Sequence, residues 1–323
     1  MDNTDKHRAG RNKTVTISDI ELSMFGERLV TLSDGRCVQV EDIIDRTLHG
    51  DMTELLPRLP ATFADLIFID PPYNLTRNFN GMKFRSSSEE EYIAYLRFWF
   101  PKVVACLKPN GSLYICGDWR STSALQTVMR ENLTVINRIT WQREKGRGAL
   151  RNWKNAMEDI WFGVNNEKEY YFNTDAVKQK RRVIAPYRKD GAPKDWITSD
   201  NGKYRLTYPS NLWDDISIPY WSMPENTDHP TQKPEKLLAK LILASCPPDG
   251  IVFDPFLGSG TTSVVAKKLG RHYIGIETSE LYCCLAEKRL AQADSDKTIQ
   301  GYTDGVFWER NTANLQRYNT KKR

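Results

Sequence analysis

The alternation of short apolar runs with amphipathic stretches is the feature that most restricts the fold of this chain. The clearest unit lies at residues 250–277, where "GIVFDPF" precedes a glycine-containing loop, the helical "TTSVVAKKLG" and the apolar "RHYIGIE". The pattern therefore indicates strand, glycine turn, helix and strand. Strands separated by helices predict an α/β fold with a mostly parallel sheet.

The same alternation occupies two parts of the chain. Before residue 143 we expect strands at 47–51, 64–70, 111–118 and 134–142, and helices at 89–107 and 121–132. After residue 225 we expect helices at 234–246, 261–270 and 279–293, and strands at 250–256 and 271–277. Residues 144–225 are basic, aromatic and interrupted by Gly and Pro, which is typical of an insertion. Residues 1–25 are expected to form a polar arm, and residues 296–323 a polar tail.

The net charge of +5 is concentrated in one segment. Between Arg143 and Lys189, twelve Lys and Arg face six Asp and Glu, so the rest of the chain sums to −1. Trp153, Trp161 and Tyr187 are among the aromatic residues interleaved with these cations. The mixture suits phosphate contacts and base stacking, although a solvated basic face has the same composition.

Composition excludes several classes of protein. No run of about 18 apolar residues occurs, and the first twenty residues lack an apolar leader segment, so we expect a cytoplasmic protein without a membrane span. The six cysteines show no C-x-x-C spacing, and the four histidines are scattered. We therefore expect reduced thiols and no metal site.

The loop "LGSGTT" is a candidate ligand site. Gly258 and Gly260 allow a ligand to approach the backbone, and the following helix N-terminus favours an anionic group. Glu277 ends the next strand, nineteen residues after Gly258, where a carboxylate can bind ribose hydroxyls. A P-loop would need a lysine that this loop lacks, and an NAD site expects glycine where Ser263 stands. S-adenosylmethionine needs neither feature, and a plain structural turn is the alternative.

A second candidate site follows the apolar run "ADLIFI". Asp70, Pro71, Pro72 and Tyr73 end this predicted strand, because proline removes ladder donors and fixes φ. A carboxylate, a rigid turn and an aromatic ring are thereby displayed at the end of a buried strand. An Asp-Pro cap with no chemical role is the alternative explanation.

Three motifs together resemble a known enzyme family. "DPPY" at 70–73, "HPTQKP" at 229–234 and "DPFLGSGTT" at 254–262 are similar to the DNA amino-methyltransferases that modify adenine N6 or cytosine N4. Their order resembles the beta class of bacterial restriction-modification enzymes, and the resemblance covers roughly residues 45–290. It implies a circularly permuted, Rossmann-like, doubly wound methyltransferase fold. Residues 26–143 would form its catalytic half, 144–225 the target-recognition insert and 226–295 the cofactor-binding half.

The resemblance also implies roles for individual residues. The Asp70 carboxylate and Pro71 carbonyl would accept the two amino hydrogens of the target base, and Tyr73 would stack on that base after it leaves the duplex. Pro72 would help to hold this geometry. S-adenosylmethionine is the implied cofactor, with these binding residues: Asp51, Thr231, Lys233, Asp254, Pro255, Phe256, Gly258, Ser259, Gly260, Thr261, Thr262 and Glu277.

Double-stranded DNA is the implied partner. Phosphate-contacting residues are expected in the insert, at Arg147, Arg151, Lys154, Arg181, Arg182, Arg188 and Lys189. The family also implies bacterial or phage origin, a homodimer, and a restriction endonuclease that acts on the same site without a stable complex. Asp at the first motif position favours adenine N6 over cytosine N4. A non-catalytic nucleic-acid-binding protein and an RNA or protein methyltransferase are the remaining alternatives.

Overall fold

The computed structural model describes residues 10–32, 35–74, 77–79, 82–84, 87–143, 151–183, 187–199 and 202–309. The helices are α1 Asp19–Gly26, α2 Val40–Ile43, α3 Met52–Leu55, η1 Leu56–Arg58, α4 Glu89–Val104, α5 Thr122–Asn132, η2 Asp175–Val177, α6 Glu235–Ser245, α7 Thr261–Lys268 and α8 Glu280–Ser295. Within these ranges, no helix combines the length and apolarity needed to cross a membrane.

Strands account for most of the remaining regular structure. They are β1 Arg46–His49, β2 Ala64–Ile69, β3 Arg77–Phe79, β4 Met82–Phe84, β5 Leu107–Gly117, β6 Thr134–Gln142, β7 Met157–Val164, β8 Gln179–Arg182, β9 Arg188–Lys189, β10 Ala192–Pro193, β11 Ile197–Ser199, β12 Gly202–Thr207, β13 Leu212–Trp213, β14 Ile251–Asp254, β15 His272–Glu277, β16 Tyr302–Thr303 and β17 Val306–Trp308.

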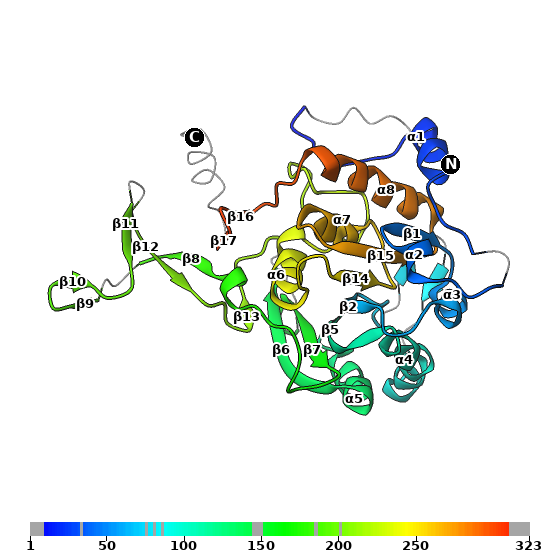
Figure 1. Cartoon of the computed structure of the whole chain (residues 1–323), viewed down its shortest axis with the longest axis horizontal. Helices are drawn as coiled ribbons and strands as arrows, with labels where there is room; N and C mark the ends of the chain where they lie inside the picture. Colours follow the sequence, from blue (N-terminus) through cyan, green and yellow to red (C-terminus); the bar gives the residue numbers. More distant parts are fainter. Residues whose placement is uncertain are drawn as a thin grey trace.

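An eight-stranded sheet in the order β1-β15-β14-β2-β5-β7-β6-β13 forms the centre of the molecule (Figure 1). Neighbouring strands from β1 through β5 are parallel, whereas β7 runs antiparallel to both β5 and β6. The expected mostly parallel α/β sheet is confirmed. Because β1, β15, β14 and β2 run in the same direction, their carboxyl ends lie along one edge of the sheet.

Strand β2 shows how both faces of the sheet are covered. All six of its residues are buried, and alternate residues belong to different core clusters because strand side chains alternate between faces. Leu66 and Phe68 pack with residues of α6 and α7, whereas Ile67 and Ile69 pack with residues of α3, α4 and α5. Burial on both faces explains why the segment reads as a continuous apolar run.

The central sheet extends into the segment that was expected to be an insertion. Strands β7 and β13 both lie within this segment. Strand β7 pairs with β5 and β6, and β13 pairs with β6. Two acids in β7 obscured the strand pattern. Their charges are satisfied locally, because Asp159 accepts hydrogen bonds from Thr122 and Thr140 at 3.0 and 2.9 Å, and Glu158 pairs with Arg143.

A second sheet, in the order β11-β12-β8-β17-β16, projects from the main body together with the β9–β10 hairpin (Figure 1). Strand β17 pairs in parallel with β8. The segment after residue 295 was expected to be a polar tail, but its residues 302–303 and 306–308 form strands of this outer sheet. Phe307 is fully buried and Trp308 is 3% exposed, which explains why this part of the chain is ordered against the body.

The N-terminal segment also has more structure than its polar composition predicted. Helix α1 begins with a capping box in which Ser18 and Glu21 exchange hydrogen bonds with each other's backbone. Glu21 then pairs with Lys288 of α8 at 2.6 Å, and Val15 forms an isolated bridge with Thr227. Residues 15–26 are therefore held against α8 and the segment before α6.

A buried charge cluster joins the outer sheet to the central core. Asp215 is 6% exposed and lies 2.6 Å from Lys236 Nζ and 2.8 Å from Lys240 Nζ, both on α6. Lys236 also donates to the carbonyl of Trp308 in β17. Burial lowers the pKa of Lys240 to about 8, even though the Asp215 carboxylate favours its charged form. Asp215 is thus the anion that compensates two buried cations.

We expect Asp215→Ala to lower the free energy of unfolding by about 3–5 kcal/mol, because it leaves two buried ammonium groups without their counter-ion. Urea denaturation followed by circular dichroism measures this change. The matched control is Asp175→Ala, which breaks an exposed pair with Lys178 and should leave the unfolding free energy nearly unchanged. Equal effects of the two substitutions would contradict the importance assigned to the buried cluster.

Candidate active site

The carboxyl ends of the parallel strands bring the predicted motifs to one edge of the central sheet. Asp70 follows β2, Asp254 ends β14, Glu277 ends β15, and Asp51 lies two residues after β1. These four strands are neighbours in the order β1-β15-β14-β2. Ligands of open α/β sheets bind at this edge, outside the carboxyl ends of the strands. The fold therefore brings together motifs separated by more than 180 residues in the sequence.

Asp70 is the centre of a partly buried polar network. Its Oδ2 accepts a short hydrogen bond from Lys233 Nζ, and its Oδ1 accepts one from the Tyr73 hydroxyl at 2.9 Å. Lys233 Nζ also lies 3.3 Å from the Tyr73 hydroxyl and 3.6 Å from Glu158 Oε2. The network thus places one ammonium between two carboxylates that come from β7 and from the end of β2.

The charge state of this network follows from its surroundings. Burial alone would lower the pKa of Lys233, but the carboxylates of Asp70 and Glu158 raise it overall, so the ammonium form persists. Burial, followed by the charges of Asp70 and Glu158, raises the pKa of Tyr73 well above its ordinary value. Tyr73 therefore remains a neutral hydrogen-bond donor beside Asp70.

Lys233, which the sequence placed among the cofactor ligands, binds the Asp70 carboxylate in the structure. Its predicted contact with the cofactor stays a prediction. Glu158, which is not among the predicted site residues, is the second acid of the same network. A buried strand that carries an acid at its centre, as in "MEDIWFG", was the available signal for Glu158.

The turn after β2 is fixed by neighbouring helices. The Tyr92 hydroxyl of α4 donates to the Pro72 carbonyl at 3.1 Å, and the Asn74 amide donates to Ser121 Oγ at 3.4 Å. Asn74 Oδ1 also accepts the Ser87 amide at 2.8 Å. Pro71 is buried between these contacts. The Asp70–Tyr73 segment consequently has a defined position relative to the sheet edge.

Several residues of the "DPFLGSGTT" loop stabilise the conformation of the loop itself. Asp254 is buried, and it accepts hydrogen bonds from the Phe256 amide at 2.9 Å and from Thr262 Oγ1 at 2.6 Å. Burial raises the pKa of Asp254 to about 7. Gly260 has φ of +82°, and a Cβ there would lie 2.5 Å from Ala286 Cβ, so glycine is required for α7 and α8 to approach. Pro255 is buried, and Phe256 packs edge-on against Trp99.

The other half of the loop presents polar groups at the sheet edge. Gly258 has φ of +56°, and its amide donates to Glu277 Oε2 at 2.9 Å. His229 covers this glycine, since a Cβ at Gly258 would lie 3.1 Å from His229 Nε2. Burial lowers the pKa of His229 to about 4, so the imidazole is neutral at pH 7. The Thr231 amide donates to His229 Nδ1 at 3.4 Å, which orients the ring.

Arg289 is a buried support of this loop that the sequence patterns did not reveal. It donates to the Ser259 carbonyl at 2.7 Å and to Thr261 Oγ1 at 3.1 Å, and it pairs with Glu235 at 3.0 Å. Helix α8 thereby stabilises the glycine loop through Arg289. No local motif marks Arg289, because its partners lie 28 to 54 residues away in the chain.

Asp51 caps a helix at the far end of the same edge. Its Oδ1 accepts hydrogen bonds from the amide and the hydroxyl of Thr53, both at 2.7 Å, at the start of α3. Asp51 is exposed. A helix cap with an exposed carboxylate is compatible with the cofactor role that the motif implies.

The predicted DNA-contacting residues fall into two groups. Arg181 and Arg182 lie in β8 and Arg188 and Lys189 in β9, all in the projecting part of the molecule, whereas Arg151 and Lys154 are exposed beside the start of β7. Arg147 lies outside the described residues. Around the outer strands, cations stack on rings: Lys180 on Trp308 at 4.4 Å, Lys203 on Trp196 at 4.9 Å, and Lys194 on Tyr187 at 5.3 Å.

The described residues contain no group of three or more His, Cys, Asp or Glu side chains arranged to hold a metal ion. At the sheet edge, Asp70 and Glu158 share Lys233, whereas Asp254 and Glu277 accept hydrogen bonds from amides or hydroxyls. The chemistry available at this edge is therefore hydrogen bonding and proton transfer by fixed carboxylate, ammonium and phenol groups.

Comparison with curated proteins identifies relatives with known activities. The chain is 36% identical over 252 residues to the DNA adenine methyltransferase YhdJ of Escherichia coli (strain K12), a match that covers 75% of this chain and 81% of that protein. It is 31% identical over 247 residues to the type II methyltransferase M.HpaI of Haemophilus parainfluenzae, covering 76% and 74% of the two chains.

Solved structures and a family of related sequences agree with these matches. The M1.HpyAVI–SAM complex superposes with a TM-score of 0.53 at 25% identity, covering 76% of this chain and 98% of that one. PvuII DNA methyltransferase (cytosine-N4-specific) shares the fold, with a TM-score of 0.55 at 19% identity and coverage of 78% and 92%. Residues 64–288 match the DNA methylase family of N6 and N4 methyltransferases. The chain therefore belongs to the N6/N4 DNA methylase family.

Proposed function

We propose that this protein transfers a methyl group from S-adenosylmethionine to the exocyclic N6 of adenine at a specific site in double-stranded DNA. The observation that carries the proposal is Asp70, held at the end of β2 by Lys233 and Tyr73, at the same sheet edge as the Gly258–Glu277 contact. The name of the E. coli relative supports adenine as the target.

The residues at the glycine loop fit the proposed cofactor. Because Gly258 has no side chain, His229 closes directly over the loop, and both residues lie where the cofactor is proposed to bind. Glu277 uses its two oxygens on the Gly258 and Ser279 amides, and a carboxylate has further lone pairs that can accept ribose hydroxyls. When bound, S-adenosylmethionine supplies an electrophilic methyl group on a sulfonium.

Asp70 and Pro71 would activate the target amino group. The lone pair of an exocyclic amine is delocalised into the ring, so the amine is a weak nucleophile until its hydrogens are accepted by the protein. In this proposal the Asp70 carboxylate and the Pro71 carbonyl accept these hydrogens, and Asp70 takes the proton that leaves after methylation. The Tyr73 ring would stack on the base that has left the duplex.

Lys233 would act as a positioning residue for Asp70. Its ammonium binds one oxygen of the carboxylate, and Glu158 holds the ammonium from the other side at 3.6 Å. Charge-assisted hydrogen bonds of this kind fix the direction in which the remaining lone pairs point. The alternative role, a contact with the carboxylate of the cofactor, is the one that the sequence motif implied.

The outer sheet would contact the DNA. Arg181, Arg182, Arg188 and Lys189 supply cations there, and the nearby stacked rings supply apolar surface, a combination suited to phosphate and sugar contacts. We extend the proposal to a cytoplasmic enzyme paired with a restriction endonuclease that acts on the same site without a stable complex, and to a homodimer. Cytosine-N4 methylation is the second candidate, because the family includes both reactions.

Expression of the gene in a methylation-deficient host should produce N6-methyladenine within one short sequence context. Digestion of the host DNA to nucleosides identifies the base, and methylome sequencing gives its context. Cells that carry Asp70→Ala are the matched control and should lack the modification. Detection of N4-methylcytosine instead would replace the adenine proposal, and the absence of any modified base in the presence of folded protein would refute the activity.

Asp70→Asn should lower kcat by at least about 10²-fold, because the amide cannot take the proton and presents a donor where an acceptor is required. Single-turnover methylation of a duplex with the identified site measures this change, and calorimetry should show unchanged cofactor affinity. The control Asp296→Asn alters an exposed acid after α8 and should retain wild-type activity. Wild-type kcat in Asp70→Asn would exclude the proposed role.

Lys233→Met should lower kcat by about 10- to 100-fold, the factor expected for loss of a hydrogen bond to a charged group of about 1.5–3 kcal/mol. The dissociation constant for S-adenosylmethionine should change little, and Lys233→Arg should recover part of kcat. If Lys233 instead binds the carboxylate of the cofactor, the methionine variant will show weaker cofactor binding and a normal kcat at saturation. The control Lys297→Met changes an exposed lysine and should behave as wild type.

A further inference from the structure

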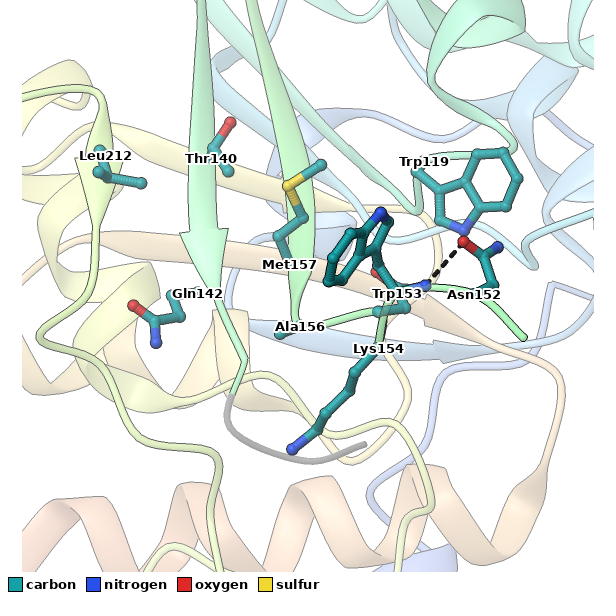
Figure 2. A pocket seen from close by; sticks show the side chains of 10 residues that line it. Trp119, Thr140, Gln142, Asn152, Trp153, Lys154, Ala156, Met157 and Leu212 are labelled. Atoms are coloured by element: carbon teal, nitrogen blue, oxygen red, sulfur yellow. Dashed lines mark hydrogen bonds between the residues drawn. The ribbon is translucent and has the colours of Figure 1, made fainter. Parts of the chain in front are cut away.

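A hollow of about 500 Å³ opens beside the active site, at the end of the central sheet where β6 finishes and β7 begins (Figure 2). Its walls come from the β5–α5 turn, the end of β6, the segment before β7 and the start of β13. We call it the tryptophan hollow. Its lining residues are Trp119, Thr140, Gln142, Asn152, Trp153, Lys154, Asn155, Ala156, Met157 and Leu212.

The tryptophan hollow lies at the same edge of the sheet as the catalytic network but does not include it. Met157 directly precedes Glu158 in β7, and because consecutive strand side chains point to opposite faces, Met157 lines the hollow from the face of β7 opposite Glu158. Trp119 lies in the same turn as Ser121, whose hydroxyl accepts the Asn74 amide after the DPPY tetrapeptide. Neither Asp70 nor Tyr73 is among the ten residues that line the hollow. A base bound there would therefore be distinct from the base proposed to be methylated at Asp70.

The apolar lining is unusually exposed for its residue types. Trp153 is 93% exposed and Trp119 is 50% exposed, and Met157 and Leu212 are exposed by 42% and 55%. Figure 2 shows Trp153 between Met157 and Trp119, with the indoles contributed by two different elements. Large apolar side chains gathered at a concave surface are typical of a binding site.

Polar groups in the hollow suit the edge of a nucleobase. Gln142, Asn152 and Asn155 each carry an amide that donates and accepts, which is the pattern needed to pair with base donors and acceptors. Lys154 adds an exposed cation that can neutralise a phosphate. None of the ten lining residues carries a carboxylate, so the site does not repel a polyanion.

The position of the hollow separates it from the cofactor site. The glycine loop and Glu277 lie at the ends of β14 and β15, whereas the hollow lies at β6 and β7, with β2 and β5 between the two regions. The catalytic acid at the end of β2 therefore stands between a site suited to the cofactor and a site suited to a stacked ring.

We propose that the tryptophan hollow binds a second nucleobase of the DNA substrate, one that leaves the helical stack but is not methylated. This inference rests on the proposed function. Indoles can replace the stacking that such a base loses, because every base has a π-face, and the amides can hold its edge. The hollow would then stabilise the opened duplex while the target base occupies the catalytic site.

Substitution of Trp153 combined with abasic nucleotides tests this site. Duplexes containing the identified sequence, each with one abasic nucleotide at a different position on either strand, are titrated with the full-length protein in the presence of S-adenosylhomocysteine. Trp153→Ala should weaken binding of the intact duplex by roughly 5- to 150-fold, the factor for loss of one stacked base. Because Trp153 is almost fully exposed, the variant should fold normally.

One position other than the target should show coupling. An abasic nucleotide there should weaken binding by the wild type but have no further effect on Trp153→Ala, since the lost base and the lost indole form one contact. The control Phe98→Ala removes a 60% exposed ring on α4, outside the hollow, and should leave all affinities unchanged. Additive effects at every position, or wild-type binding by Trp153→Ala, would overturn the second base site.

Three further outcomes separate this inference from the alternatives. If Trp153→Ala binds DNA normally but loses affinity for S-adenosylmethionine, the hollow holds the adenine of the cofactor and the inference is wrong. Normal methylation by the wild type together with an unaffected variant overturns the second base site alone. A wild-type protein that methylates no DNA overturns the proposed function, and the second base site with it.

Discussion

The contact between Lys233 and Asp70 is the interaction on which the arrangement of the active site depends. It joins the segment before α6 to the end of β2, and Glu158 of β7 completes it from the centre of the sheet. Glu158 and Lys233 are buried and Asp70 is partly buried, so the two carboxylates would repel each other without Lys233, and Lys233 would lose its charge without them. The three groups are therefore stable only together, which fixes the relative positions of chain segments that lie up to 163 residues apart.

The fold was predictable because buried strands and amphipathic helices each require a recognisable pattern of apolar residues in the sequence. Strand β2 is apolar throughout, since helices cover both faces, and helices such as α4 begin with clear capping residues. Strand β7 was missed for the opposite reason: Glu158 and Asp159 interrupt its apolar run. Their partners are Thr140 on β6, Arg143 just after β6 and Thr122 on α5, which become neighbours only after the sheet has formed. The local sequence pattern therefore does not reveal that the charges of Glu158 and Asp159 have partners in the folded protein.

The site was predictable in outline and not in its contacts. Motif spacing placed Asp70, Gly258 and Glu277 correctly at strand ends, because the geometry of parallel strands is general. It could not assign Lys233 between the catalytic acid and the cofactor, since a lysine reaches several groups from one backbone position. Arg289 illustrates the same limit: its support of the glycine loop depends on how α8 crosses α7, which no short stretch of sequence specifies.

The antiparallel strand β7 has a consequence for how the site can work. Because β7 enters the sheet from the active-site edge, its first residues, and not its last, lie there: Glu158 reaches Lys233, and Met157 lines the tryptophan hollow. A parallel strand would present only its carboxyl end and the loop that follows. One reversed strand thus supplies both a counter-ion of Lys233 and a wall of the tryptophan hollow. The segment before β7 is therefore connected to Asp70 through Glu158 and Lys233. If this segment moves when DNA binds, the movement can change the position of Asp70.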